Sequence, residues 1–343
     1  MARYLERLFG SAPADGGSRA ARVALSAIAV IALLTVLFNL GGLGAAMNEL
    51  GLYLGYAFIR RALVVGALVA LCAALLGVTL VLKRYSMIGD GLSHVGFGAL
   101  SIAAALGFVT ADALPSFLPA AFREWIASLC VGVAANPLAF TLAVVIALAF
   151  LILRMSERSA IRGDAAIALL STSALAVGVL AASLTSGMNV DVMNYMFGSI
   201  LAMSAADVAV SVVLAVAVLV LFVLFSNRIF AVTFDEAFAR ATGTRVGAYN
   251  MLIAILTAVT IVIGMRLMGT MLISSLIIFP ALTSMRVYSR FKAVMVCSGV
   301  VSVVCFVAGI LLSCLDAVTA GAAIVLAYLA AFLIFSLAGR ARA

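Results

Sequence analysis

The chain has 343 residues, of which 66% are hydrophobic and only 10% charged, and its mean hydropathy is +1.31. This composition excludes a soluble globular protein and indicates a polytopic membrane protein. The formal net charge is +8, but the basic residues are scattered in pairs at the ends of apolar runs. A nucleic-acid-binding patch is therefore not expected.

The chain opens with a polar stretch, residues 1–22, that is expected to be a cytoplasmic lead. The apolar run 23–43 predicts an additional transmembrane helix, because its basic lead is long and a good signal-peptide cleavage site does not follow it. Residues 48–61 carry aromatic side chains together with Arg60 and Arg61, which favours a short interfacial helix outside the bilayer.

The remaining apolar runs are long enough to span a bilayer and predict an all-α fold with nine or ten transmembrane helices. They do not alternate polar and apolar residues, so an outer-membrane barrel is excluded. A very short interruption at 265–267 leaves the exact number open. The expected spans after the first are 62–82, 87–108, 137–153, 165–184, 207–225, 247–264, 268–285, 293–313 and 320–338.

Basic residues predict the orientation of these spans in the cell membrane. If both termini, including the tail 339–343, are cytoplasmic, nearly all Lys and Arg residues lie on the cytoplasmic side, as the positive-inside rule requires. The exceptions are Arg60, Arg61, Arg123 and Arg266.

One polar pair stands inside the third apolar run. Asp90 and His94, the only histidine, are four residues apart and therefore lie on one face of a helix. An ionisable residue within a membrane span is by default a candidate functional site, and a carboxylate with an imidazole suits zinc or manganese. The residues alone leave open a purely structural Asp–His pair that ties helices together.

Two stretches between the spans are less regular. The external loop 109–136 contains a segment, 117–131, that favours an amphipathic surface helix. Residues 185–204 are too apolar for an ordinary loop and too interrupted for a span, which predicts a short broken or re-entrant helix. Its four methionines would suit copper(I), but methionine more often serves as flexible packing.

The cytoplasmic stretch 226–246 predicts a short amphipathic helix that Gly243 terminates. Glu236 and Arg240 form an i,i+4 pair, which is expected on its exposed face. A surface helix in an otherwise minimal loop suggests a docking site for a partner subunit, although an interfacial helix that rests on membrane lipid has the same pattern. The five cysteines have no C-x-x-C spacing, and a bridge between Cys130 and Cys314 is left open.

Several stretches, in order, resemble the permease family of metal-ion ABC transporters, which serves zinc, manganese and iron import. The resemblance covers 48–338 and implies a permease domain there, with the span 23–43 outside it. Its motifs are Lys83-Arg84 through Ser93-His94, Asp164 to Ile167, Tyr195-Met196-Phe197-Gly198, a coupling helix at 235–243, Arg266 through Thr283, and Asp316 to Leu326.

This resemblance implies the function and the partners. Asp90 and His94 would coordinate the transported metal, zinc being slightly favoured over manganese although Thr172 stands near the place of a further histidine in zinc-type members. A separate ATPase would bind the coupling helix through Asp235, Glu236, Ala237, Arg240 and Gly243, and an external metal-binding protein would deliver the ion to a permease homodimer. The chain has no Gly-x-x-x-x-Gly-Lys-Ser/Thr loop for ATP, no intrinsic cofactor is expected, and the chain itself is not expected to be an enzyme.

Two other classes of membrane protein fit the sequence less well. An ATP-independent metal channel or secondary transporter could also contain an Asp–His pair, but it would not need a cytoplasmic docking helix. An intramembrane metalloenzyme would need a third protein ligand and a positioned base, and the sequence offers neither clearly.

Overall fold

The computed structural model describes residues 55–85, 87–108, 119–158, 163–183, 205–316 and 318–340. The expected cytoplasmic lead, the expected span 23–43, the first half of the expected interfacial helix 48–61 and the segment 185–204 lie outside the described residues. All regular secondary structure within the described residues is helical, which confirms the all-α prediction.

Eleven helices make up the described part of the chain. They are α4 (Ala57–Leu82), α5 (Ile88–Leu106), α6 (Ala120–Ala135), α7 (Pro137–Arg158), α8 (Gly163–Ser183), α10 (Ala205–Phe234), α11 (Glu236–Ala241), α12 (Val246–Met268), α13 (Thr270–Met285), α14 (Phe291–Asp316) and α15 (Ala320–Arg340).

Six of these helices have the length and hydropathy to cross a membrane on their own. Residues 123–135 of α6 and 137–152 of α7 pass the same criteria only as a pair, which is bent by 92°, and α13 is a shorter apolar helix. The six are Ala57–Leu82, Ala165–Ser183, Asp207–Phe234, Val246–Met268, Phe291–Leu315 and Ala320–Gly339.

Some boundaries differ from the sequence predictions, and local chemistry explains each difference. Arg60 and Arg61 belong to the first turns of α4 and not to a separate interfacial helix, because no glycine or proline separates them from the rest of its apolar run. For the same reason α10 continues past residue 225 to Phe234. A helix does form in the external loop, but it runs over 120–135, after Pro119.

The break between α12 and α13 lies at a single residue, Gly269, and not at 265–267. Gly269 has a φ of 87° and a ψ of 162°, a conformation that is essentially accessible only to glycine. Arg266 therefore stays helical, and its guanidinium lies 3.1 Å from the carboxylate of Asp207 in the first turn of α10.

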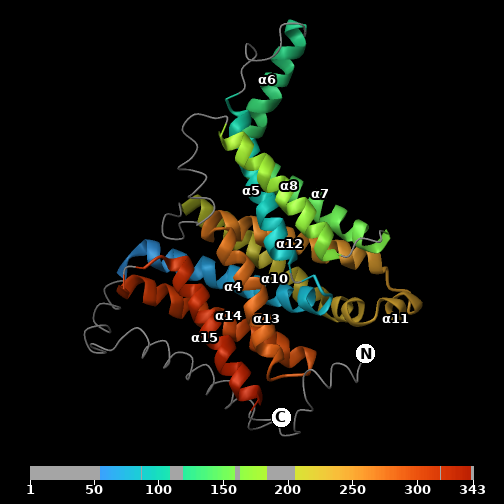
Figure 1. The fold of residues 1–343 in the computed structure, drawn as a ribbon, viewed down its shortest axis with the longest axis vertical. Helices are drawn as coiled ribbons and strands as arrows, with labels where there is room; N and C mark the ends of the chain where they lie inside the picture. Colours follow the sequence, from blue (N-terminus) through green and yellow to red (C-terminus); the bar gives the residue numbers. More distant parts are fainter. Residues whose placement is uncertain are drawn as a thin grey trace.

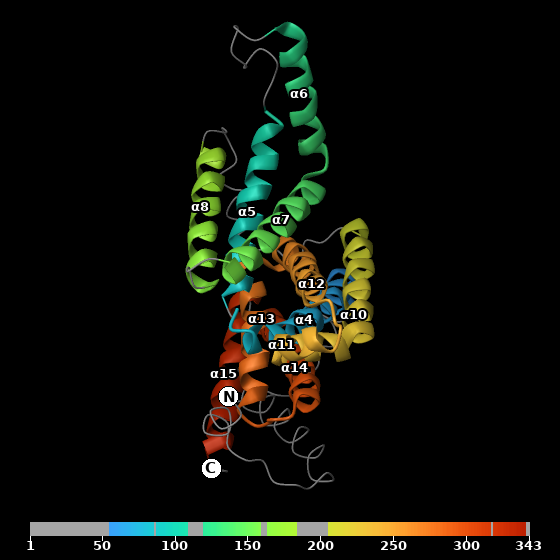
Figure 2. The same cartoon turned by 90° about the vertical axis from the view of Figure 1, so that its right-hand side faces the viewer.

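The helices pack in two groups, one around α5 and α8 and the other around α4. In Figures 1 and 2, α5 and α8 run side by side above the region of α4, and α6 projects away from the rest of the molecule. Helix α4 packs against α10, α12, α13 and α14, and α15 covers α13 and α14. Large buried side chains of this core include Leu76, Ile261, Phe306 and Tyr328.

Glycines let α5 approach its neighbours closely. A Cβ atom on Gly98 would lie 2.3 Å from the carbonyl oxygen of Ala174 in α8, and one on Gly178 would lie 2.5 Å from the Cα atom of Gly98. These distances are far below van der Waals contact, so the two backbones touch only because both positions lack a side chain. This packing fixes α5 as a buried helix beside α8.

Candidate functional site

Helix α5 is buried nearly all round, and its two ionisable residues are the exceptions. From Ile88 to Ser101 every side chain is buried apart from those of Asp90 and His94. The side chain of Asp90 is 46% exposed and that of His94 is 26% exposed. The polar pair therefore lies on the side of this part of α5 that its neighbours leave partly uncovered.

The predicted pairing of Asp90 with His94 is present. The His94 Nε2 and Asp90 Oδ1 atoms are 3.6 Å apart, which is close enough for electrostatic attraction but longer than an ordinary hydrogen bond. Asp90 is also in the first turn of α5, where the helix dipole favours a carboxylate. The two side chains can thus offer one oxygen and one nitrogen to the same ion.

A third polar residue next to Asp90 comes from α13. The hydroxyl of Ser274 lies 3.3 Å from Asp90 Oδ1 and 3.1 Å from the carbonyl oxygen of Thr270. Sequence reasoning missed Ser274, because it is 184 residues from Asp90 and one sequence shows no tertiary pairing. The only signal was the pair Ser274-Ser275 inside the apolar run 271–282.

The neighbourhood of Asp90 spans the break between α12 and α13. A Cβ atom on Gly96 would meet the side chain of Met265 in α12, and one on Gly89 would meet Ile277 in α13. Helix α5 therefore crosses the break at Gly269, with Asp90 and Ser274 on the α13 side. A movement of α13 relative to α12 would change the surroundings of Asp90.

The described part of one chain offers few side chains that could bind a metal ion. No group of three His, Cys, Asp or Glu side chains suited to a metal ion occurs among the described residues. Asp90 and His94 can supply two ligands of the hard and borderline types that zinc and manganese accept. An ion held between them would need further oxygen ligands, from water, from backbone carbonyls or from another chain.

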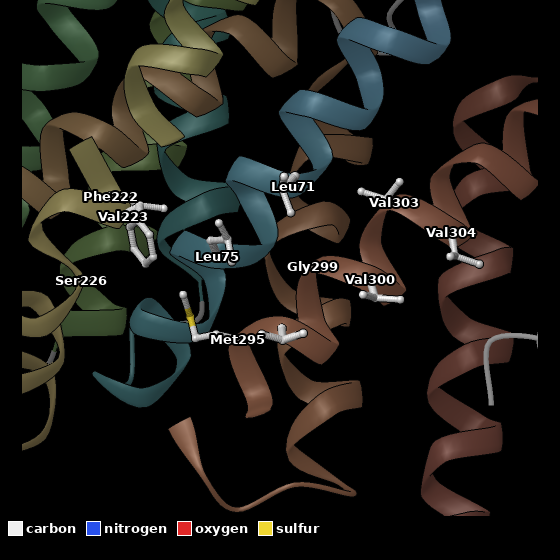
Figure 3. A pocket seen from close by; sticks show the side chains of 11 residues that line it. Leu71, Leu75, Phe222, Val223, Ser226, Met295, Gly299, Val300, Val303 and Val304 are labelled. Carbon is white, nitrogen blue, oxygen red and sulfur yellow. The ribbon is translucent and has the colours of Figure 1, made fainter. Parts of the chain in front are cut away.

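A groove elsewhere in the described structure is apolar. It has a volume of about 610 Å³ and lies between α4, α10 and α14 (Figure 3). Its walls carry almost no polar atoms, so it offers no ligands to a metal ion. The lining side chains include those of Leu71, Leu75, Phe222, Met295 and Val300.

A second cluster of polar groups lies at α11, where the sequence predicts a coupling helix. Asp235 caps this helix, and its carboxylate accepts a hydrogen bond of 2.9 Å from the backbone N–H of Phe238, as short polar residues do at helix N-termini. Gly243 follows the helix with a φ of 79°, which favours glycine. The C-terminal signal predicted at Gly243 is confirmed, and the structure adds the N-terminal cap at Asp235.

The outer surface of α11 is exposed. The side chains of Ala237, Phe238 and Arg240 face solvent, whereas Ala239 is buried. A Cβ atom on Gly243 would meet nothing within 4 Å. Helix α11 thus presents small residues and one large aromatic ring, Phe238, which is 65% exposed.

Glu236 keeps a 43% exposed side chain, but its close ion pair is with Lys83 instead of the predicted i,i+4 partner Arg240. Its carboxylate turns toward the body of the protein and lies 2.7 Å from the Nζ atom of Lys83, at the end of α4. Burial of Glu236 opposes its ionisation, but the contacts with Lys83, with the Asn250 amide and with the charge of Arg240 outweigh this. The pKa of Glu236 is therefore below its usual value.

Other predicted positions take no part in these two clusters. Residues 195–198 lie outside the described residues. The hydroxyl of Thr172 donates to the carbonyl of Ala168 in its own helix at 2.7 Å. Cys130 and Cys314 are both free thiols in this structure.

A known protein family matches nearly all of the described part of the chain. Residues 55–339 match the ABC 3 transport family. The chain belongs to the ABC 3 transport family. This confirms the resemblance and, with its several apolar helices, makes the chain a multi-pass membrane protein.

Relatives within the ABC 3 transport family align over most of the chain. The chain is 28% identical to the manganese transport system membrane protein MntC of Halalkalibacterium halodurans, over 80% of this chain and 84% of that protein. It is 26% identical to the high-affinity zinc uptake system membrane protein ZnuB of Haemophilus influenzae, over 77% of this chain and 91% of that protein.

Solved structures support the ABC 3 fold. A chain of PsaBC from Streptococcus pneumoniae, in complex with Fab, has a TM-score of 0.68 at 25% identity, covering 86% of this chain and 95% of that chain. An inward-facing putative metal-chelate type ABC transporter has a TM-score of 0.58 at 15% identity, covering 89% and 95% of the two chains. The latter similarity concerns the fold alone.

Proposed function

We propose that this chain is the membrane-spanning permease subunit of an ABC importer for divalent transition-metal ions. The observation that carries the proposal is the pair Asp90 and His94, 3.6 Å apart and partly open on the otherwise buried helix α5. The names of the family relatives, a manganese and a zinc transport protein, support the same class of cargo.

Two ligands per chain suit a site that must release what it binds. A closed site with four protein ligands holds zinc for structural purposes, whereas an ion on Asp90 and His94 would keep water or backbone oxygens in its coordination shell. Such a site would select weakly among first-row ions, and affinity would follow the general order in which zinc exceeds manganese. We therefore favour zinc slightly, with the main selectivity in an external metal-binding protein.

The driving force would come from a separate ATPase at α11. Helix α11 is held to the body by Ala239 and Glu236 and presents Ala237, Phe238 and Arg240 outward. Small residues at Ala237 and Gly243 would let a partner approach closely. A second copy of the permease would face the opening beside Asp90 and complete the pathway, and α13 exposes Met271 and Leu282 on one side for such a contact.

The test is metal uptake by the reconstituted complex with Asp90→Asn or His94→Ala. Both variants should insert and assemble but lose metal-dependent uptake, because each removes one of two ligands. Glu124→Gln is the matched control, since this carboxylate is exposed on α6 and should tolerate the change. Uptake at the wild-type rate in either site variant would refute the ligand assignment, and loss of the folded protein would indicate a structural pair.

Metal binding to the purified permease alone tests the identity of the ion. We expect both zinc and manganese to bind at equilibrium, zinc somewhat more tightly. Discrimination far beyond the intrinsic difference between the ions would require ligands other than Asp90 and His94. It would contradict a two-ligand site.

A further inference from the structure

The turn between α4 and α5 is held in a fixed geometry. Arg84 has a φ of 63°, in the left-handed region that few residues other than glycine adopt. The N–H of Tyr85 donates to the carbonyl of Leu80 at 2.9 Å, and the N–H of Arg84 donates to that of Val81 at 3.1 Å. These two bonds form a Schellman motif, so Lys83 and the start of α5 are connected by a defined corner.

Lys83 connects this corner to two other helices. Its Nζ atom donates to Glu236 Oε1 of α11 at 2.7 Å and to Asn250 Oδ1 of α12 at 2.6 Å. The Asn250 amide donates in turn to Glu236 Oε1 at 3.2 Å. We call these three residues, Lys83, Glu236 and Asn250, the corner triad.

Two members of the corner triad are withdrawn from water, whereas the Glu236 side chain is 43% exposed. The Lys83 side chain is only 8% exposed, and Asn250 is 7% exposed. A buried ammonium without its counter-charge is costly, so Lys83 cannot easily separate from Glu236. If α11 moves, the corner between α4 and α5 has to move with it, because otherwise Lys83 is left buried without its counter-charge.

The remaining attachment of α11 to the body is apolar and less directional. Ala239 packs with Val232 of α10 and Val246 of α12 in a small separate cluster. Apolar contacts tolerate small sliding movements, whereas short charge-assisted hydrogen bonds impose distance and direction. Of these contacts, the corner triad is the one that fixes the distance and direction between α11 and the α4–α5 corner.

We infer that the corner triad transmits movement of the coupling helix α11 to α5, so that Lys83, Glu236 and Asn250 are positioning residues for transport. This inference rests on the proposed function, in which an ATPase acts on α11. The path is short, because Lys83 is the residue after α4, and Asp90 follows it in the first turn of α5. A displacement of α11 would thereby tilt the helix that carries Asp90 and His94.

The experiment compares ATP hydrolysis with metal uptake in the reconstituted complex of permease, ATPase and binding protein. Lys83→Met should leave the ATPase bound and hydrolysing ATP, while most of the zinc taken up per ATP is lost. Lys83→Arg should restore most of this ratio. Lys292→Met is the matched control, since Lys292 is exposed at the start of α14, and it should leave the ratio unchanged.

A double variant separates transmission from stability. Lys83→Met with Glu236→Leu removes both charges, which commonly leaves stability intact or improved, yet it should remain uncoupled. A merely structural triad predicts instead that the double variant transports normally, or that uptake and hydrolysis fall together with the amount of folded complex. Either result would overturn the inference. A wild-type complex that binds no ATPase would overturn the proposed function itself, whereas an active wild type with fully coupled variants would overturn only the role of the triad.

Discussion

Replacing Gly178 with alanine should weaken the contact between α5 and α8. The added Cβ atom would lie 2.5 Å from the Cα atom of Gly98, whereas ordinary contact begins at 3.4 Å, so the helices must separate by about 0.9 Å (3.4 minus 2.5). The Cα atom belongs to a helix backbone and the Cβ atom is bonded directly to one, so neither can move aside as the end of a long side chain could. Overpacking of this kind costs about 1–3 kcal/mol.

The intrinsic helix propensity of alanine offsets part of this cost. Alanine in a helix is favoured over glycine by about 1 kcal/mol, which leaves a net loss of about 1–2 kcal/mol if the contact term lies in the upper part of its range. With an unfolding entropy of about 2.1 cal/mol/K per residue over 343 residues, this corresponds to a fall in melting temperature of roughly 1–3 °C. The measurement is thermal unfolding of the purified protein in detergent.

Gly132→Ala supplies the matched control for this experiment. Gly132 lies in α6, and a Cβ atom there would meet nothing within 4 Å. The same substitution should therefore leave the melting temperature unchanged or raise it slightly. If Gly178→Ala is as stable as Gly132→Ala, the close backbone contact between α5 and α8 is not present in the protein.

Two further substitutions address the corner and the docking surface. Arg84→Gly should stabilise the protein by about 0.5–1 kcal/mol, because glycine adopts the positive φ of this exposed position without strain; a lower melting temperature would contradict the left-handed conformation. Ala237→Trp should weaken co-purification of the ATPase or uncouple hydrolysis from uptake, while metal binding to the permease persists. Unchanged co-purification together with unchanged coupling would show that the ATPase does not contact this face.

Much of the helical framework can be predicted from the sequence because apolar runs of about 20 residues have few alternatives in a membrane protein. The predicted spans at 165–184 and 320–338 correspond closely to α8 and α15. Boundaries were less predictable where the chain contains no breaker, as in α10, which continues to Phe234. The short break between α12 and α13 was recognised but misplaced, because the decisive feature is the backbone conformation of Gly269.

The candidate site, too, could be predicted from the sequence only in part. The proximity of Asp90 and His94 follows from helical spacing alone, and the structure confirms that they share a face. The position of Ser274 and the contact of Lys83 with Glu236 depend on tertiary packing across 184 and 153 residues. Helical spacing pairs Glu236 with Arg240 as a local interaction, whereas the structure places the buried charge of Lys83 next to its carboxylate.

The glycine contact between α5 and α8 also determines which parts of the protein can rearrange together. With backbone against backbone at Gly98 and Gly178, there is no layer of side chains to accommodate independent shifts of the two helices. Helix α8 must therefore travel with α5 as one body. Its outward side carries the exposed side chains of Leu169, Val177 and Leu180, so this body can be displaced against fluid hydrocarbon with little disturbance of the protein interior.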